Sequence, residues 1–221
     1  MQLRRPALLA FAAVASLTAA GALANPAGPA VAPTAPPPSL PACVADDAVA
    51  GRSGYSDWAA TLLDPAHALP EGYEPPDLTT EYVAGNPVRL RTFVFGPLRD
   101  MLNAAALDRV KIGVTSAYRS LAAQAALENR LGHVDDLVAR PGHSEHQLGT
   151  ALDLNGGANW LEENAWHYGF VLSYPPERSP AWTCYRSEPW HVRYFGITRA
   201  AEIEASGLSP REWLWAHSLA E

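Results

Sequence analysis

Lysine is almost missing from this sequence of 221 residues, in which Lys111 is the single example. The 16 lysine and arginine residues are outnumbered by 23 acidic ones, so the formal net charge is −7. A protein that binds nucleic acid needs clustered basic side chains to neutralise phosphates. The composition therefore argues against nucleic acid as the main partner.

A hydrophobic run of the length that spans a bilayer is also missing. The N-terminal apolar stretch, residues 7–19, is short and rich in alanine, whereas a spanning helix needs about 20 apolar residues. Arg4 and Arg5 precede this stretch, and Ala22-Leu23-Ala24 follows it as a small-x-small cleavage site. The arrangement predicts a signal peptide over residues 1–24 and export to the periplasm, the cell wall or the medium. The alternative is an uncleaved anchor. Because no cysteine follows directly, we expect no lipoprotein anchor, and no stable membrane anchor after cleavage.

Cysteine is scarce as well, since the chain contains only Cys43 and Cys184. Disulfides persist in the compartments that an exported protein reaches. We therefore predict a disulfide between these two residues, which would tie the N-terminal arm to the region before His191. The alternative is a pair of soft metal ligands, which the lack of a CxxC pair disfavours.

Residues 25–42 lack charge and have almost no large apolar side chains. This Pro/Ala-rich run cannot bury a core and is predicted to be an extended linker. The hydrophobic content of the whole chain is 48%, so residues 43–221 are expected to form one globular domain, and we expect a monomer. The first part of that domain, residues 43–86, is interrupted by prolines and is expected to be rich in loops.

Hydrophobic periodicity and end signals predict a mixture of helices and short strands. The predicted strands are residues 88–95, 111–116 and 170–174. The predicted helices are residues 98–110, 120–131 with Ser120 as N-cap, and 159–168 ended by Gly169. The order shows no regular alternation of strand and helix, which indicates the α+β class.

Catalytic zinc usually takes three protein ligands, and His146 and Asp153 are candidates for two of them. On a continuous helix their spacing of seven residues would separate them by about 10 Å. A tight turn at Gly149-Thr150 would instead form a hairpin and set them face to face, with Cβ atoms about 5 Å apart. His191 would be the third ligand and Glu188 the proton-transfer residue. Since residues three apart on a regular strand face opposite sides, a kink is expected between these two.

Taken singly, each of these residues has a plainer interpretation as a surface polar group or a turn cap. Their combination is more specific, and it lies within longer motifs. The motifs are Ser144-x-His146-x-x-Gly149-x-Ala151-x-Asp153, Glu188-x-Trp190-His191, Ser116-Ala117-Tyr118-Arg119-Ser120 with Gln124, and Trp160-Leu161-x-x-Asn164-Ala165-x-x-Tyr168-Gly169-Phe170. In this order they resemble the LAS-type zinc peptidases, which include VanY-like D-alanyl-D-alanine carboxypeptidases. The resemblance covers about residues 85–196.

The resemblance implies a small antiparallel sheet with flanking helices, the zinc fold of hedgehog domains and D,D-peptidases. It implies one zinc ion held by His146, Asp153 and His191. In this family the residue matching Glu188 acts as general base and then general acid, and the one matching Arg119 binds the substrate or its developing oxyanion.

Three further positions are implied with less specific roles. Gln124 and Ser144 match substrate contacts, to the terminal carboxylate or to the stem-peptide backbone. Trp190 is expected to wall the pocket, or to pack in the core. The family pattern does not use His143 as a ligand, and the remaining histidines are expected on the surface or in packing roles. They are His67, His133, His167 and His217.

By resemblance, the first expectation for function is removal of the terminal D-alanine from peptidoglycan stem peptides. An L,D-carboxypeptidase and a peptidoglycan endopeptidase of the same family are the alternatives. A different class of function, a catalytically inactive module that binds the cell wall, is disfavoured because the chain retains Glu188, Arg119 and all three ligands.

Overall fold

The computed structural model describes residues 39–44, 57–132 and 136–218. The signal peptide expected over residues 1–24 lies outside these ranges, as does the expected linker up to residue 38. Within the described ranges, none of the helices has both the length and the apolar character needed to cross a membrane.

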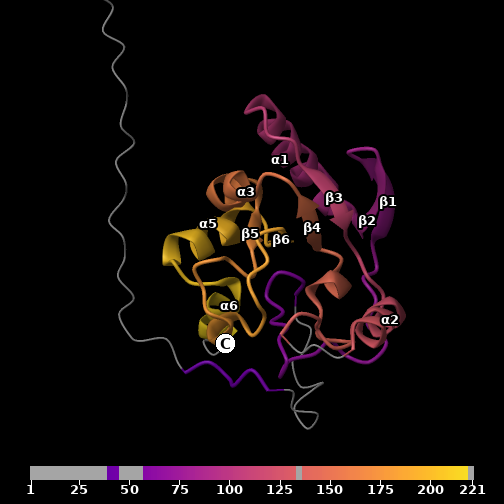
Figure 1. Cartoon of the computed structure of the whole chain (residues 1–221), viewed down its shortest axis with the longest axis vertical. Helices are drawn as coiled ribbons and strands as arrows, with labels where there is room; N and C mark the ends of the chain where they lie inside the picture. Colours follow the sequence, from indigo (N-terminus) through magenta and orange to yellow (C-terminus); the bar gives the residue numbers. More distant parts are fainter. Residues whose placement is uncertain (1–38, 45–56, 133–135, 219–221) are drawn as a thin grey trace, which may run out of the picture. The chain divides into compact units, whose positions relative to one another are not determined.

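A four-stranded antiparallel sheet lies at the centre of the fold (Figure 1). Its strands follow the order β3-β4-β6-β5. They are β3 (Gly113–Ser116), β4 (Ala151–Asn155), β6 (His191–Tyr194) and β5 (Phe170–Leu172). The predicted α+β class and the small antiparallel sheet are therefore confirmed, and the predicted strands at 111–116 and 170–174 are present in shortened form.

Nine helical segments surround the sheets within the described residues. They are η1 (Thr92–Val94), α1 (Phe95–Leu107), α2 (Leu121–Leu131), η2 (Glu145–Leu148), α3 (Ala158–Asn164), η3 (Ala165–Tyr168), α4 (Pro180–Thr183), α5 (Ile197–Ser206) and α6 (Pro210–Ser218), where η marks a 3-10 helix. The three predicted helices correspond to α1, α2 and α3 with η3. The Ser120 hydroxyl accepts a hydrogen bond from the Ala123 N–H at the start of α2, as its predicted N-cap role requires.

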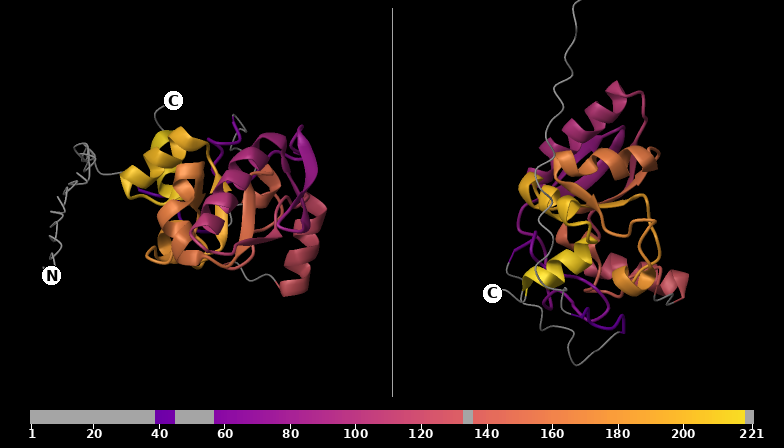
Figure 2. Two further views of the ribbon diagram at one scale, coloured as in Figure 1. Left: turned by 90° about the horizontal axis from the view of Figure 1, so that it is seen from above. Right: turned by 90° about the vertical axis from the view of Figure 1, so that its left-hand side faces the viewer.

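The strand β1 (Leu78–Val83) was not expected from the sequence, and neither was the β-hairpin that it forms with β2 (Asn86–Arg91). The two strands are paired antiparallel. Most of β1 is exposed or half-buried, so its sequence carries no clear alternation of apolar and polar residues. The strand expected at 88–95 begins earlier and ends at Arg91, where η1 leads directly into α1. Figure 2 shows this hairpin, in purple, at one end of the sheet and the yellow helices α5 and α6 at the other.

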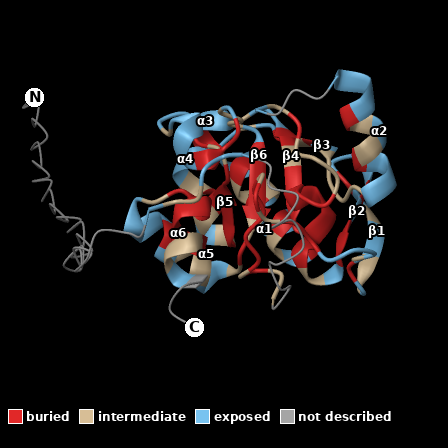
Figure 3. Ribbon diagram, turned by 90° about the horizontal axis from the view of Figure 1, so that it is seen from below, coloured by how far each residue is buried: buried red, intermediate tan, exposed pale blue. Residues whose placement is uncertain are grey.

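The two faces of the central sheet have different roles. Leu152 of β4 lies opposite Val192 of β6, and both belong to the core cluster that contains the buried side chains of α1. Leu98 and Met101 of α1 are fully buried in that cluster, and Figure 3 shows most of β4, β5 and β6 as buried. The neighbouring pair, Asp153 and His191, therefore points to the other face.

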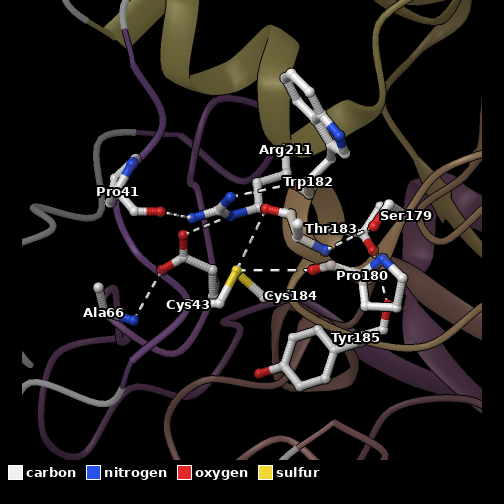
Figure 4. The surroundings of a disulfide bond; sticks show 12 residues. Pro41, Cys43, Ala66, Ser179, Pro180, Trp182, Thr183, Cys184, Tyr185 and Arg211 are labelled. Atoms are coloured by element: carbon white, nitrogen blue, oxygen red, sulfur yellow. Dashed lines mark hydrogen bonds and ion pairs between the residues drawn. A yellow bond between two sulfur atoms is a disulfide. The ribbon is translucent and has the colours of Figure 1, made fainter.

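The predicted disulfide between Cys43 and Cys184 is present. Figure 4 shows Arg211 of α6 beside this bridge, with its guanidinium reaching Pro41. The guanidinium donates to the carbonyl oxygens of Pro41, at 2.9 Å, and Trp182, at 3.1 Å. Its Nε also donates to Asp64 Oδ2 at 2.7 Å. The N-terminal arm is thus joined both covalently and by a buried ion pair to the C-terminal part of the fold.

Candidate active site

Two of the predicted metal ligands are direct cross-strand neighbours. Asp153 on β4 is in register with His191 on β6, and Asp153 Oδ1 lies 3.1 Å from His191 Nδ1. Directly opposed residues on one sheet face have Cβ atoms about 5 Å apart, close enough to share a metal ion. The strand pairing itself therefore builds half of the site.

His146 reaches this pair from η2, and the hairpin predicted at Gly149-Thr150 is wrong. Residues 145–148 form a 3-10 helix, which Gly149 ends at φ 71°. The positive φ favours glycine at this position, and a Cβ atom on Gly149 would also displace Leu78 Cδ2, from which it would lie 2.9 Å. The turn brings His146 Nε2 to 3.2 Å from Asp153 Oδ2. The two residues meet as expected, by a different backbone path.

The two histidines present different ring nitrogens to the site. His146 Nδ1 donates to the carbonyl oxygen of Ala117 at 2.6 Å, which leaves Nε2 toward Asp153. His191 Nε2 is 3.0 Å from Glu145 Oε2, which leaves Nδ1 toward the same carboxylate. One ligand atom from each of these two histidines and from Asp153 lies within 4.8 Å of the others. Two nitrogens and one oxygen suit zinc, and three ligands leave a fourth position for water.

The pKa values of this cluster reflect its dense charge. Burial would raise the pKa of Asp153, but the two histidines hold it well below its usual range. Burial would lower the pKa of His191, but hydrogen bonds to Asp153 and Glu145 raise it to about 10. Because a metal binds only the deprotonated ring nitrogen, zinc binding through His191 Nδ1 is coupled to the release of a proton.

Glu188 lies beside the cluster because of a turn. The His191 N–H donates to the carbonyl oxygen of Glu188 at 3.0 Å, so the expected kink is present. Glu188 Oε2 then lies 3.8 Å from His191 Nδ1. Burial raises the pKa of Glu188. The nearby His191 acts to lower this pKa, and the negative charge of Asp153 acts to raise it further. A carboxylate with a raised pKa is better suited to accept a proton from water.

Arg119 lies on the other side of Asp153, with NH2 3.8 Å from Asp153 Oδ2. Its NH2 donates to Ser116 Oγ at 3.1 Å and its NH1 to Gln124 Oε1 at 2.7 Å. Gln124 Nε2 in turn donates to the Ala139 carbonyl oxygen at 2.6 Å. Both ends of this amide are engaged and only 1% of Gln124 is exposed. The geometry therefore favours a role of Gln124 in holding Arg119 in place, and not the expected direct contact of Gln124 with substrate.

A cavity of about 190 Å³ opens beside these residues. Ser144 and Trp190 line it, together with the metal cluster, Glu188 and Arg119. Trp190 is 43% exposed, which fits the expected pocket wall and not the alternative core role. Apolar side chains also line the cavity, namely Leu127, Leu131, Leu137 and Val138. The cavity is thus lined by both charged and apolar side chains.

The geometry matches a known family of enzymes. The sequence model described as VanY, D-alanyl-D-alanine carboxypeptidase, matches residues 88–197. A D-alanyl-D-alanine carboxypeptidase of Enterococcus faecalis is 31% identical over 182 residues, which are 72% of this chain and 66% of that protein. The chain belongs to the VanY family. It spans just under two thirds of the length of this curated relative.

Solved structures of VanY-family proteins have the same fold as this chain. Two structures of VanY, VanYB with D-alanine-D-alanine and a VanY mutant with Zn(II), are each 31% identical with a TM-score of 0.61. Each covers 72% of this chain, and the match spans 98% and 99% of those chains. The LdcB LD-carboxypeptidase is 29% identical with a TM-score of 0.62, over 70% of this chain and 86% of its own. The zinc complex agrees with the donor set of this VanY-family chain.

Sequence reasoning missed two charged residues next to the VanY-family cluster, Glu145 and Arg193. Arg193 follows His191 by two positions on β6 and therefore shares its sheet face, a signal that was available from the strand pattern. Glu145 precedes the ligand His146, and no sequence pattern indicates its role. Its neighbours in space are evident only from the position of η2 in the structure. Arg193 NH1 donates to Glu145 Oε1 at 2.9 Å.

The other histidines that the structure describes lie outside the ligand cluster. His143 is buried, and its Nδ1 donates to the carbonyl oxygen of Asp64 at 2.8 Å. His67 Nδ1 lies 2.7 Å from Asp64 Oδ1. His167 stacks on Trp166 and His217 on Trp213. His133 falls outside the described residues.

Proposed function

We propose that the chain is a zinc-dependent D-alanyl-D-alanine carboxypeptidase that removes the terminal D-alanine of peptidoglycan stem peptides. The observation that carries this proposal is the cluster of His146, Asp153 and His191, whose ligand atoms lie within 4.8 Å of one another. Glu188 and Arg119 flank that cluster in the same cavity. Membership of the VanY family and the binding of D-alanine-D-alanine by VanYB support the choice of substrate.

Each residue of the site has a distinct task in the proposed reaction. Bound by His146, Asp153 and His191, zinc supplies a Lewis acid that polarises the scissile carbonyl and lowers the pKa of water. Glu188 accepts the proton of the attacking water and delivers it to the amine of the departing D-alanine. Arg119 binds the oxyanion that develops on the carbonyl, or the substrate carboxylate, through its fixed guanidinium.

The hydrogen bonds around Arg119 support this division of tasks. Ser116 and Gln124 hold its guanidinium beside the cluster, so little orientation is left to arrange during the reaction. Ser144 lines the cavity and is a candidate contact for the stem-peptide backbone. Trp190 supplies an exposed aromatic wall at the same opening, suited to cover the apolar part of a peptide.

An L,D-carboxypeptidase is the second candidate, because LdcB has the same fold at similar identity. The experiment is to incubate the purified zinc protein with pentapeptide and tetrapeptide stems and to weigh the products. Loss of alanine from the pentapeptide is expected. Loss from the tetrapeptide alone would favour the L,D reaction, and cleavage within a cross-linked stem would favour an endopeptidase. Stripping the metal with a chelator should abolish turnover, and added zinc should restore it.

We also propose that the protein acts outside the cytoplasm as a monomer, with residues 1–24 removed as a signal peptide. The Cys43–Cys184 disulfide supports this location, since such bridges persist in oxidising compartments. Residues 25–42 would then link the mature N-terminus to the catalytic domain, residues 43–221. The intact mass of protein recovered from outside the cytoplasm should correspond to a chain that begins at Asn25, and a full-length mass there would contradict cleavage.

A further inference from the structure

A buried carboxylate lies directly behind the metal cluster. Glu145 Oε2 is 3.0 Å from His191 Nε2 and accepts a hydrogen bond from Ser173 Oγ at 2.6 Å. Its other oxygen, Oε1, accepts from Arg193 NH1 at 2.9 Å. The side chains of all these residues have at most a few per cent of their surface exposed. Glu145 therefore has a defined partner for each oxygen and is largely shielded from solvent.

We propose that Glu145 is a positioning residue of the metal centre, which fixes His191 as a ligand through Nδ1 and is itself held by Arg193. The inference rests on the proposed zinc site, because it assigns His191 a ligand role. It extends that site by two residues that contact no substrate and no metal.

The two nitrogens of the His191 ring have different partners. A neutral imidazole carries one N–H and one lone pair, and only the lone pair binds a metal. A carboxylate that accepts the Nε2 hydrogen leaves the lone pair on Nδ1, which is the nitrogen 3.1 Å from Asp153. Partners of this kind fix the orientation of a ligand histidine and make it more basic.

Arg193 gives Glu145 both its charge balance and its orientation. Arg193 is completely buried, and its NH2 donates to the carbonyl oxygens of Trp58 at 2.9 Å and Thr61 at 2.8 Å. The two oxygens of Glu145 thus have different partners, with Oε1 on Arg193 and Oε2 on His191 and Ser173.

A buried ion pair can also have a purely structural role, and the chain offers a matched control for that case. Asp64 is a buried carboxylate that contacts His67 Nδ1 at 2.7 Å and Arg211 Nε at 2.7 Å. It thus has the same kinds of partner as Glu145, but its histidine is outside the ligand cluster. Exchanging carboxylate for amide is the same chemical change at both positions.

The test compares Glu145→Gln with Asp64→Asn by zinc affinity, measured in competition with a chelator. Glu145→Gln should weaken zinc binding by about 10- to 100-fold, the usual effect of losing such a partner. Asp64→Asn should change zinc affinity by less than about twofold, although both variants should unfold at lower temperature than the wild type. The visible absorption of the Co(II) form should change in Glu145→Gln only, since it reports the ligand geometry.

Unchanged zinc affinity in Glu145→Gln, or an equal loss in Asp64→Asn, would overturn the inference. If Glu145→Gln does not fold, Ser173→Ala removes one hydrogen bond to the same oxygen and should still weaken zinc binding by a few-fold, and no weakening would count against the proposal. Wild-type protein that binds no stoichiometric zinc, or His191→Ala that retains wild-type affinity, would instead refute the zinc site itself.

Discussion

Two buried carboxylates of this protein have nearly the same set of partners and very different surroundings. Glu145 contacts His191, Arg193 and the Ser173 hydroxyl. Asp64 contacts His67, Arg211 and the Ala66 N–H. We call the first set the sheet triad, Glu145, His191 and Arg193, and the second set the arm triad, Asp64, His67 and Arg211.

The difference between the triads lies in what the histidine and the arginine contact next. In the sheet triad, His191 turns its second nitrogen toward Asp153 and His146. In the arm triad, Arg211 extends to Pro41 and Trp182 beside the disulfide. The same ionic arrangement thus supports a metal centre in one place and anchors a chain segment in the other. A buried carboxylate between a histidine and an arginine does not by itself indicate a metal site or a catalytic site.

The largest expected effect comes from a residue that belongs to neither triad, although it lies close to His191. Glu188→Gln removes the proton acceptor and should lower kcat by about a thousandfold, within the range known for general bases. Zinc content and the unfolding midpoint should remain close to those of the wild type, because Glu188 is not one of the three metal ligands and the exchange keeps the size of its side chain. Product formation from pentapeptide, followed by mass, gives the rate. Wild-type turnover in this variant would remove Glu188 from the mechanism.

A variant of the arm triad should have the opposite signature. Arg211→Met leaves Asp64 buried without its guanidinium partner and should lower the free energy of unfolding by about 3 kcal/mol. Zinc affinity and kcat at a temperature well below unfolding should not change. Denaturant unfolding, monitored by tryptophan fluorescence, measures the first quantity. A fall in zinc affinity as large as that expected for Glu145→Gln would erase the distinction between the triads.

A smaller effect, on the free energy of unfolding, is expected when the pH is lowered. Burial would raise the pKa of Asp64, but His67 and Arg211 lower it below its usual value. A carboxylate with a depressed pKa in the folded state stabilises the fold above its unfolded pKa of about 3.9, and that stabilisation is lost as the pH falls further. The free energy of unfolding should therefore decline more steeply below about pH 4 in the wild type than in Asp64→Asn. Urea titrations between pH 6 and pH 3 give both slopes, and equal slopes would contradict the lowered pKa.

The metal cluster could be predicted from the sequence because its residues lie within spaced motifs. The hairpin proposed to join His146 to Asp153 was wrong, since spacing alone does not distinguish a two-residue turn from a 3-10 helix ended by Gly149. The actual face-to-face pair is Asp153 and His191, 38 residues apart. Pairing between distant strands depends on the whole sheet, which local patterns do not report.

Other parts of the fold could not be predicted from the sequence for related reasons. The strand β1 has mostly exposed or half-buried side chains and so lacks the alternation that identifies a strand. Glu145 would be expected on the surface from its type, because an isolated buried carboxylate is costly. Its burial depends on Arg193, which is 48 residues away in sequence. The disulfide could be predicted because the chain has two cysteines, and one pairing was available.

The register between β4 and β6 links the metal centre to correct folding. Ala151 lies opposite Arg193, and Asp153 opposite His191, all on the face away from α1. A slip by one residue would place Asp153 and His191 on opposite faces of the sheet, because side chains alternate between faces. Only the native register therefore offers zinc its cross-strand ligand pair, so a bound ion would stabilise that register over its neighbours. Zinc binding would then favour the native alignment of β4 and β6, in addition to its part in catalysis.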